Sequence, residues 1–488
     1  MFKKHLSEIL SLEYEKQILV IDEDQVIDRY NYLSLFKNRG FKTEQYNNHI
    51  EFRYKDETEL KSSTEPFAVY VKGDLYIPYD ILQRFYVVKL TWDIIFPNIN
   101  RAFIERYSNV ELPLFYALSD SMNKGYEIKE DVISSMDERL LYQPEVVAEG
   151  LKELIAELRN EIHRKKLRST DWLRIAEKKA RINYLAAKAE IEVDTVFVDD
   201  AFKNFVMNGY NNLSTERNKL HPMLVNRIPE FVGDGKNKVA LIVLDGMSLF
   251  DFQVIAEEFD GIDYDAHQTF AMIPTTTAIS RQSMLAGEFP VKLERPFNLS
   301  REEKQFIERG EKLGYRQEQI QYEKKLDFIL KPITRYLTVI INIIDDLVHS
   351  QLQGREGMYR DVKQFARSGA LQRMVSALSK EGFTIYLTAD HGNTLCTGIG
   401  GIRGKGIDME SKAKRVLIMK DFAEVDDIKE KYHLMEYPGY YLDKKYKYLI
   451  SNTGESLDNQ GQQVLTHGGI SIEEVIVPFI KVKAVQYE

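Results

Sequence analysis

The chain has 488 residues, of which 44% are hydrophobic, 29% charged and 11% aromatic, and this excludes both a single small module and a wholly disordered protein. Its formal net charge of −9 argues against a surface built throughout for nucleic acid, so any phosphate chemistry has to rely on a local site. Cys396 is the only cysteine, which excludes an intramolecular disulfide and a metal site built from cysteines. Metal ligands in this chain must therefore come from Asp and His.

The sequence predicts neither a secretory leader nor a membrane span. Ser, Glu, Tyr and Lys interrupt the apolar run within residues 1–16, unlike a secretory signal. The longest apolar stretch, residues 336–344, is far shorter than the ~20 residues that a membrane span needs. We therefore expect a cytoplasmic protein that does not bind membranes.

Short apolar runs predict strands in the first part of the chain. They cover residues 19–23, 49–54, 67–71 and 85–99, and helical patterns lie between them. We therefore expect a small α/β domain over residues 1–125.

Long helical patterns follow from about residue 144 to 193, with Glu and Lys or Arg three and four residues apart. Such spacing is typical of a solvated helix face. We expect residues 126–232 to form a helical connector suited to docking partners.

After about residue 230 the sequence pattern changes to apolar, β-branched runs that alternate with predicted helices. This pattern is typical of a mostly parallel sheet with helices on both faces. We expect residues 233–488 to form such an α/β domain, with insertions near residues 291–331 and 397–465. The predicted strands cover residues 238–244, 336–344, 383–389, 415–420 and 474–484.

Three of these strands are followed by a carboxylate, namely Asp245, Asp345 and Asp390. Ligands of open α/β sheets gather outside the carboxyl ends of the strands, so these side chains can converge in one crevice. Taken singly, each also fits a turn or a helix cap.

Three histidines accompany the carboxylates. His391 directly follows Asp390, His349 lies one helical turn after Asp345, and His467 precedes two glycines. Carboxylate oxygen and imidazole nitrogen together suit zinc and related divalent ions. The six side chains supply almost enough ligands for two ions, and one more oxygen would complete the set. Two neighbouring ions stabilise the attacking and the leaving oxygen in a displacement at phosphorus.

A run of three threonines, residues 275–277, offers a nucleophile, because metal binding activates a hydroxyl for attack. Arg281 lies four residues after Thr277 and offers a planar guanidinium for phosphoryl oxygens. The run also fits a strand edge or a turn. Thr275 and Thr276 remain alternatives to Thr277 as the attacking residue.

The order of these motifs resembles the alkaline phosphatase superfamily and, within it, the PglZ-domain family, over residues 236–485. The motifs are Asp-Gly, then Pro-Thr-x-Thr with a tail ending in Leu-Ala-Gly, then Asp-x-x-x-His, Asp-His-Gly and His-Gly-Gly. The resemblance implies an alkaline phosphatase-like core and Thr277 as the nucleophile, because its spacing to Arg281 is similar to that of the sulfatase nucleophile box. The nucleophile position is Thr and not Cys, which disfavours a sulfatase. The implied ligands are Asp245, Thr277, Asp390 and His391 for one metal, and Asp345, His349 and His467 for the other.

This resemblance implies a hydrolase, specifically a two-metal phosphodiesterase acting on nucleotides or oligonucleotides through a covalent phosphothreonine. The expected metal is zinc, with manganese as the alternative. The resemblance further implies a component of bacterial antiviral defence of the bacteriophage-exclusion (BREX) type, with other phage-defence proteins as partners. A phosphomonoesterase, a phosphoglycerate mutase and a non-catalytic, metal-bound scaffold or sensor are the alternatives; the complete ligand set argues against the scaffold.

Other features are less specific. The glycine-rich residues 398–406 lack the Ser or Thr after Lys that a phosphate-binding P-loop needs. We expect a loop beside the metals, whose Arg403 and Lys405 either touch a substrate or stay solvated. Trp92 and Trp172 are expected to pack in cores.

Overall fold

The computed structural model describes residues 1–483 apart from residues 31, 74, 108–109, 124–137, 165, 403–412 and 421–422. By its contacts the chain divides into two units, Met1–Ala156 and Glu157–Glu488. The expected boundary between residues 125 and 126 lies outside the described residues, so the three-part division stays a prediction. None of the described helices combines the length and the apolar composition that crossing a membrane requires.

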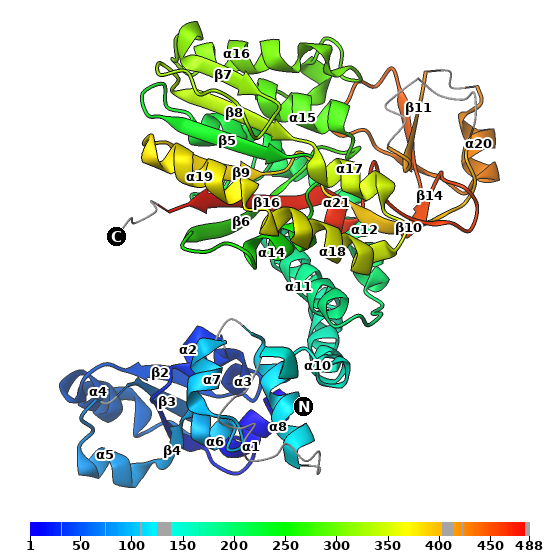
Figure 1. The fold of residues 1–488 in the computed structure, drawn as a ribbon. Helices are drawn as coiled ribbons and strands as arrows, with labels where there is room; N and C mark the ends of the chain where they lie inside the picture. The colour runs from blue at the N-terminus through cyan, green and yellow to red at the C-terminus, as the bar shows by residue number, and fades with distance from the viewer. Residues whose placement is uncertain are drawn as a thin grey trace. The chain divides into compact units, whose positions relative to one another are not determined.

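The first unit contains a four-stranded sheet in the order β2-β3-β1-β4, with all neighbours parallel (Figure 1). Its strands are β1 (Gln17–Asp22), β2 (Lys42–Tyr46), β3 (Phe67–Lys72) and β4 (Tyr86–Leu90). Its helices are α1 (Phe2–Ile9), α2 (Val26–Arg29), α3 (Leu33–Lys37), α4 (His49–Lys55), α5 (Tyr79–Arg84), α6 (Trp92–Ile95), α7 (Arg101–Arg106) and α8 (Leu112–Asn123). The strands predicted near residues 19–23, 67–71 and the start of 85–99 are confirmed.

The strand predicted at residues 49–54 is wrong, because these residues form α4. The Asn48 side chain caps this helix by accepting a hydrogen bond from the backbone N–H of Glu51 at 2.9 Å. The alternation of polar and apolar residues in this segment does not mark a buried sheet face, since Ile50 and Tyr54 are exposed and Phe52 is buried. The polar edge strand β2 carries no apolar signal and was not predicted.

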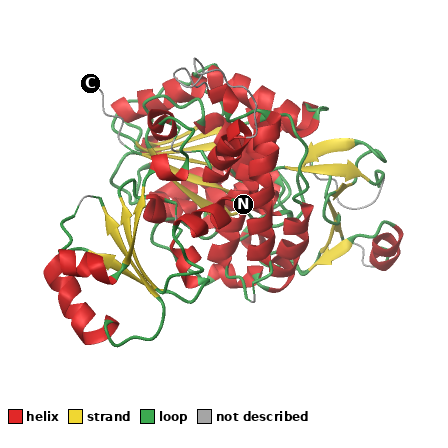
Figure 2. Cartoon of the chain, turned by 90° about the horizontal axis from the view of Figure 1, so that it is seen from below, coloured by secondary structure: helices red, strands yellow, loops and turns green. Residues whose placement is uncertain are grey.

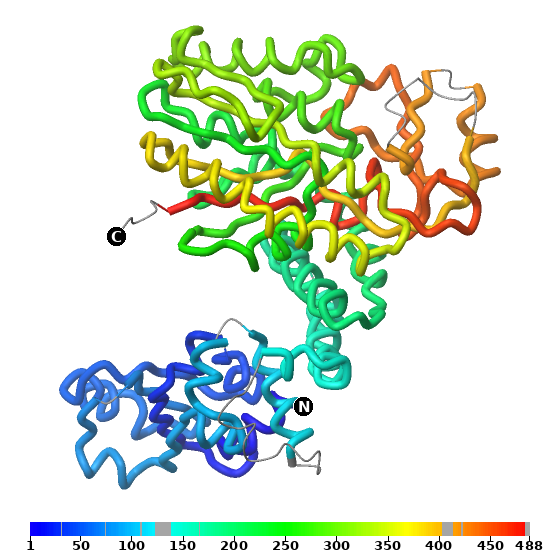
Figure 3. The backbone as a smooth tube through the Cα atoms, in the orientation of Figure 1, coloured from blue at the N-terminus to red at the C-terminus, as the bar shows by residue number. Residues whose placement is uncertain are grey.

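The second unit is built around a six-stranded sheet in the order β6-β16-β9-β5-β8-β7. Its strands are β5 (Val239–Leu244), β6 (Tyr264–Phe270), β7 (Ile320–Glu323), β8 (Tyr336–Ile341), β9 (Thr384–Thr388) and β16 (Ile476–Val482). β7, β8, β5 and β9 are parallel, whereas β16 runs antiparallel to β9 and β6. Figure 3 shows this C-terminal strand, in red, among green and yellow segments. Every residue of β5 and β8 is buried, as expected for a sheet covered on both faces.

Two groups of helices pack with this sheet. The first group consists of α11, α14, α18 and α19, in which the first three contact one another and α19 contacts α18. The second group consists of α13, α15 and α16, in which α15 contacts both of the others. The α/β class with a parallel-rich sheet and helices is therefore confirmed. The helices of the chain from residue 144 onward are α10 (Pro144–Ile162), α11 (Ser169–Lys188), α12 (Val196–Asn208), α13 (Ile228–Val232), α14 (Leu249–Ala256), α15 (Thr277–Ala286), α16 (Glu302–Lys312), α17 (Ile343–Ser350), α18 (Gly354–Arg367), α19 (Ala370–Lys380), α20 (Val425–Lys431) and α21 (Ile472–Val475). Single turns are η1 (Asp56–Leu60), η2 (Glu138–Leu140), η3 (Tyr210–Ser214), η4 (Val225–Arg227), η5 (Pro290–Lys292), η6 (Leu299–Arg301) and η7 (Gln317–Gln319).

Two three-stranded sheets lie beside the main sheet, at the right of Figure 2. One has the order β14-β10-β15 and the other β11-β13-β12. The predicted strand at residues 415–420 forms as β11, but in the second small sheet and not in the main one, because its apolar residues pack in a separate core with α20. The strands are β10 (Thr394–Gly398), β11 (Val416–Met419), β12 (Met435–Tyr437), β13 (Lys447–Ile450), β14 (Glu455–Ser456) and β15 (Gln463–Thr466).

Two predictions about charged segments need correction. The face of α11 is not solvated throughout, because Lys179 is 1% exposed and pairs with Asp199 of α12 and Glu473 of α21. The segment predicted as an insertion, residues 291–331, belongs in part to the main sheet. It includes α16 and β7, and β7 is an edge strand of that sheet. Trp92 and Trp172 are buried as predicted.

Candidate metal centre

The three predicted aspartates meet at one edge of the main sheet. β5, β8 and β9 are parallel neighbours, so their carboxyl ends lie side by side. Asp245 directly follows β5 and Asp390 lies two residues after β9. Asp345 lies in the first turn of α17 and not at the strand end as predicted, because β8 already ends at Ile341. All three side chains are buried.

Asp245, Asp390 and His391 form the first cluster, in which each residue offers a ligand atom within 4.8 Å of the others. Nε2 of His391 lies 3.6 Å from Asp245 Oδ1 and 3.8 Å from Asp390 Oδ2. Nδ1 of His391 donates to the carbonyl oxygen of Gly392 at 2.9 Å. This bond leaves Nε2 as the ring nitrogen that faces the carboxylates.

Asp345, His349 and His467 form the second cluster. Oδ1 of Asp345 lies 3.1 Å from His349 Nε2 and 3.5 Å from His467 Nε2. Nδ1 of His467 donates to the carbonyl oxygen of Thr275 at 3.0 Å, so its Nε2 also faces its cluster. The rings of His467 and His391 stack with centroids 4.2 Å apart, which places the two clusters next to each other.

The three threonine hydroxyls have different surroundings. Thr275 Oγ1 donates to the carbonyl oxygen of Gly469 at 3.0 Å and accepts from the N–H of Gly468 at 3.1 Å. Thr276 caps α15 by accepting from the backbone of that helix. Thr277 Oγ1 lies 3.0 Å from His391 Nε2. Among the three hydroxyls, that of Thr277 therefore contacts a cluster residue.

Arg281 lies one turn further along α15 and is almost fully buried. Its Nη1 donates to Asp245 Oδ2 at 2.6 Å and its Nε donates to Glu302 Oε2 at 2.9 Å. Burial alone would lower the pKa of Arg281, but Asp245, Asp390 and Glu302 raise it above its ordinary value, so the side chain stays cationic. Its guanidinium thus orients Asp245, and a contact with phosphoryl oxygens stays a prediction.

The clusters have the chemistry that a divalent cation requires. Asp245 Oδ1 and Asp390 Oδ2 are buried acceptors without a hydrogen-bond donor among the described residues. Burial and the neighbouring Asp245 carboxylate raise the pKa of Asp390 to about 7. A bound cation would supply the charge and the ligand bonds that these oxygens lack. The residues therefore fit two metal ions.

The histidine pKa values are shifted in opposite directions. Burial lowers the pKa of His467 well below its ordinary value, which favours the neutral, ligating form. Burial also acts to lower the pKa of His391, but the Asp390 and Asp245 carboxylates outweigh it and raise that pKa. Without a bound ion, His391 is therefore the histidine whose protonated form is stabilised by the neighbouring carboxylates.

Glu474 is a supporting residue that the sequence reasoning missed. Its Oε1 accepts from the N–H of Gly469 at 2.8 Å and from Thr275 Oγ1 at 3.3 Å, while its Oε2 pairs with fully buried Arg415. The carboxylate therefore ties the threonine run to the loop that carries His467. The available signal was an adjacent pair of glutamates, residues 473 and 474, at the start of the apolar run for which the sequence predicts a single strand. Arg403 and Lys405 lie outside the described residues.

This α/β fold and its two neighbouring Asp and His clusters are those of an alkaline phosphatase-like domain. The profile of a family described as the BREX system PglZ alkaline phosphatase-like domain matches residues 224–482, just over half of the chain. The chain therefore belongs to the PglZ family, a family of alkaline phosphatase-like domains of the BREX system. No curated protein matches the sequence.

Several solved structures are distantly similar, among them the following three. An inactive variant of murine ectonucleotide pyrophosphatase/phosphodiesterase 5 in complex with AMP is 12% identical, with 50% of this chain and 88% of that chain covered and a TM-score of 0.35. The human protein is 10% identical, with coverages of 50% and 87% and a TM-score of 0.34. Phosphonoacetate hydrolase from Sinorhizobium meliloti in complex with phosphonoformate is 9% identical, with coverages of 51% and 90% and a TM-score of 0.30.

Proposed function

We propose that this chain is a two-metal phosphohydrolase in which Thr277 is the nucleophile. The observation that carries the proposal is the 3.0 Å distance between Thr277 Oγ1 and His391 Nε2, within a cluster that stacks on a second one. Membership of an alkaline phosphatase-like family supports phosphoester hydrolysis as the reaction class. Nucleotide or oligonucleotide phosphodiesters are the proposed substrates.

The residues divide into two ligand sets and an attacking group. Asp245, Asp390 and His391 would hold one ion with Thr277, and the cluster of Asp345 would hold the other. Bound zinc or manganese would lower the pKa of the Thr277 hydroxyl and offset charge on the phosphoryl group. Arg281 holds Oδ2 of Asp245, which leaves Oδ1 for a ligand bond.

The Thr277 hydroxyl gives up its proton as Oγ1 bonds to phosphorus and the bond to the leaving oxygen breaks, and the leaving oxygen takes up a proton to depart as an alcohol. Water then hydrolyses the phosphothreonine, which restores the Thr277 hydroxyl and releases a phosphomonoester. Thr277 is the first residue of α15, so negative charge that develops at its hydroxyl lies at the positive end of that helix dipole. Burial of the threonine side chain keeps bulk water away from the oxygen that attacks.

The family assignment supports a role in BREX phage defence, and we propose other defence proteins as partners and the cytoplasm as the location. These proposals depend on the family description and not on the geometry of the site.

The test is hydrolysis of bis(4-nitrophenyl) phosphate by the purified chain with Zn²⁺ or Mn²⁺. We expect turnover by the wild type and none by Thr277→Ala at unchanged metal content. A 4-nitrophenyl monoester measured in parallel decides between diesterase and monoesterase. A wild type that binds two ions and hydrolyses neither ester would contradict the proposal and favour a metal-bound scaffold.

A further inference from the structure

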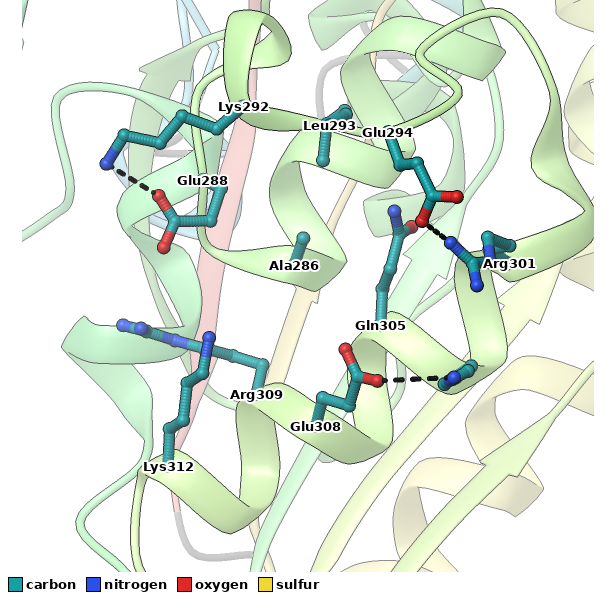
Figure 4. A pocket seen from close by; sticks show the side chains of 11 residues that line it. Ala286, Glu288, Lys292, Leu293, Glu294, Arg301, Gln305, Glu308, Arg309 and Lys312 are labelled. Atoms are coloured by element: carbon teal, nitrogen blue, oxygen red, sulfur yellow. Dashed lines mark hydrogen bonds and ion pairs between the residues drawn. The ribbon is translucent and has the colours of Figure 1, made fainter.

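A second charged site lies between the C-terminal end of α15 and α16 (Figure 4). The cavity has a volume of about 510 Å³, which is within the range of small-molecule sites. Apart from Ala286 and Leu293, its lining consists of charged residues and one glutamine. No aromatic ring belongs to this lining, so it offers no platform for stacking a base.

Three cations of the lining are balanced by three glutamates, and dashed lines in Figure 4 mark the pairs of Lys292 with Glu288 and of Arg301 with Glu294. The pairs are Lys292 with Glu288 at 3.1 Å, Lys304 with Glu308 at 3.7 Å, and Arg301 with Glu294. These pairs leave no negative charge of the lining for the two remaining cations, Arg309 and Lys312.

Arg309 and Lys312 lie three residues apart on α16, and no described residue forms an ion pair or a hydrogen bond with the side chain of either. In Figure 4 both side chains leave the same end of the helix and no dashed line reaches them. Nε of Arg309 is buried without an acceptor, and so is Oε1 of Gln305 without a donor. Both atoms lack a partner among the described residues, so a molecule from outside the chain can bond to them.

The position of Arg309 has a partial structural explanation. Its guanidinium lies against Gly287, where a Cβ atom would be 2.6 Å from Nε, and Gly287 ends α15 in the left-handed region. The negative end of the α15 dipole therefore attracts Arg309. This attraction leaves Nε without an acceptor and does not involve Lys312.

We propose that Arg309 and Lys312 bind the phosphate group of a small anion in this cavity. Guanidinium offers a planar fork to phosphate oxygens, and ammonium adds a point charge three residues away on the same helix face. Without an aromatic platform, recognition is of the phosphate charge and not of a base. The cavity is separate from the metal centre, because the ten residues of α15 place its two ends about 15 Å apart.

The cavity has a direct structural link to the centre. Glu302, which begins α16, accepts from Arg281, and Arg281 in turn holds Asp245. An anion bound by Arg309 and Lys312 therefore contacts the helix that supports a metal-binding carboxylate. The binding proposal itself does not depend on the catalytic one.

The test is calorimetric titration of the full chain with inorganic pyrophosphate after removal of metal ions by a chelator, so that the metal centre does not compete. We expect saturable binding by the wild type and at least tenfold weaker binding by the double variant Arg309→Gln/Lys312→Gln. The control is Arg217→Gln/Lys431→Gln, which removes the same charge from exposed positions outside the cavity. Its affinity should equal that of the wild type.

Lys312→Gln alone, at an exposed position, gives a second measurement that does not depend on folding and should weaken binding severalfold. The proposal is overturned if the wild type shows no saturable binding, if the double variant binds as tightly as the wild type, or if the control pair loses as much affinity as the double variant.

Discussion

Thr277 Oγ1 lies 3.0 Å from Nε2 of His391 in a site where both side chains are buried. The hydroxyls of the two preceding threonines have other partners, in the Gly468–Gly469 loop and at the start of α15. This difference separates three residues that the sequence could not rank with certainty. It leads to predictions about Thr276 and Thr277.

Thr277→Ala should lower kcat for a phosphodiester at least about a thousandfold, because it removes the attacking oxygen. Thr277→Ser keeps that oxygen and should retain measurable turnover. Thr276→Ala should cost about 1 kcal/mol of stability through loss of the α15 cap while activity remains. Steady-state kinetics measures kcat, and urea unfolding measures the stability. An inactive Thr276→Ala beside a fully active Thr277→Ala would show that the nucleophile is assigned to the wrong threonine.

The two clusters predict a metal stoichiometry of two ions per chain. His349→Ala removes a ligand of the second cluster at a partly exposed position, so it should reduce the content to about one ion without unfolding the protein. His163→Ala, at an exposed position outside both clusters, is the matched control and should keep two. Elemental mass spectrometry of dialysed protein gives the count. Equal metal content in the two variants would argue against the second site.

The stability of the metal-free protein should depend on pH through Asp390. Its folded pKa, raised to about 7 by burial and Asp245, lies above the unfolded value, so its stabilising contribution is complete at low pH and is lost as the pH rises through 7. The loss amounts to at most about 4 kcal/mol. Chelated wild type should therefore unfold at lower temperature at pH 8 than at about pH 5, and added Zn²⁺ should reverse the change.

Asp390→Asn is the variant that isolates this effect. In the chelated protein, this variant should show a smaller fall in unfolding temperature between about pH 5 and pH 8 than the wild type. A smaller fall should remain, because burial also raises the pKa of Asp251 to about 6 in the same unit. An equally steep decline in Asp390→Asn, or a wild type whose stability increases over this pH range, would exclude Asp390 as the origin.

The ion pair between Arg415 and Glu474 should be essential for the stability of the His467 loop. Both side chains are fully buried, and Glu474 also holds Thr275 and Gly469. Arg415→Met leaves a buried carboxylate without its cation, so we expect a loss of about 3 to 5 kcal/mol in urea unfolding. Lys445→Met breaks an exposed pair with Asp443 and should leave the unfolding midpoint unchanged. Similar midpoints for the two variants would contradict this role.

Much of the site could be predicted because its residues follow from the ends of buried parallel strands. β5 is a continuous apolar run and β9 is a short run rich in β-branched and aromatic residues, so the positions of Asp245 and Asp390 after them are visible in the sequence. The pair of Asp345 and His349 was visible from helical spacing, although the helix begins earlier than the apolar run suggested. Convergence of these residues follows from the parallel arrangement.

Other features depend on tertiary contacts that local patterns do not encode. α4 was mistaken for a strand because a short alternating segment fits either period, and the Asn48 cap decided the outcome. β11 joined a small sheet because of its pairing with β13. The burial of Lys179 and Glu474 could not be predicted, since a charged residue becomes buried only when a distant partner compensates it.

Anomalous diffraction from crystals grown with Zn²⁺ and recorded at the zinc edge locates the metal ions themselves. We expect two peaks, one bounded by Asp245, Asp390 and His391 beside Thr277 Oγ1, and one bounded by Asp345, His349 and His467. Peaks at other positions only, with these six side chains free of metal, would contradict a two-metal site.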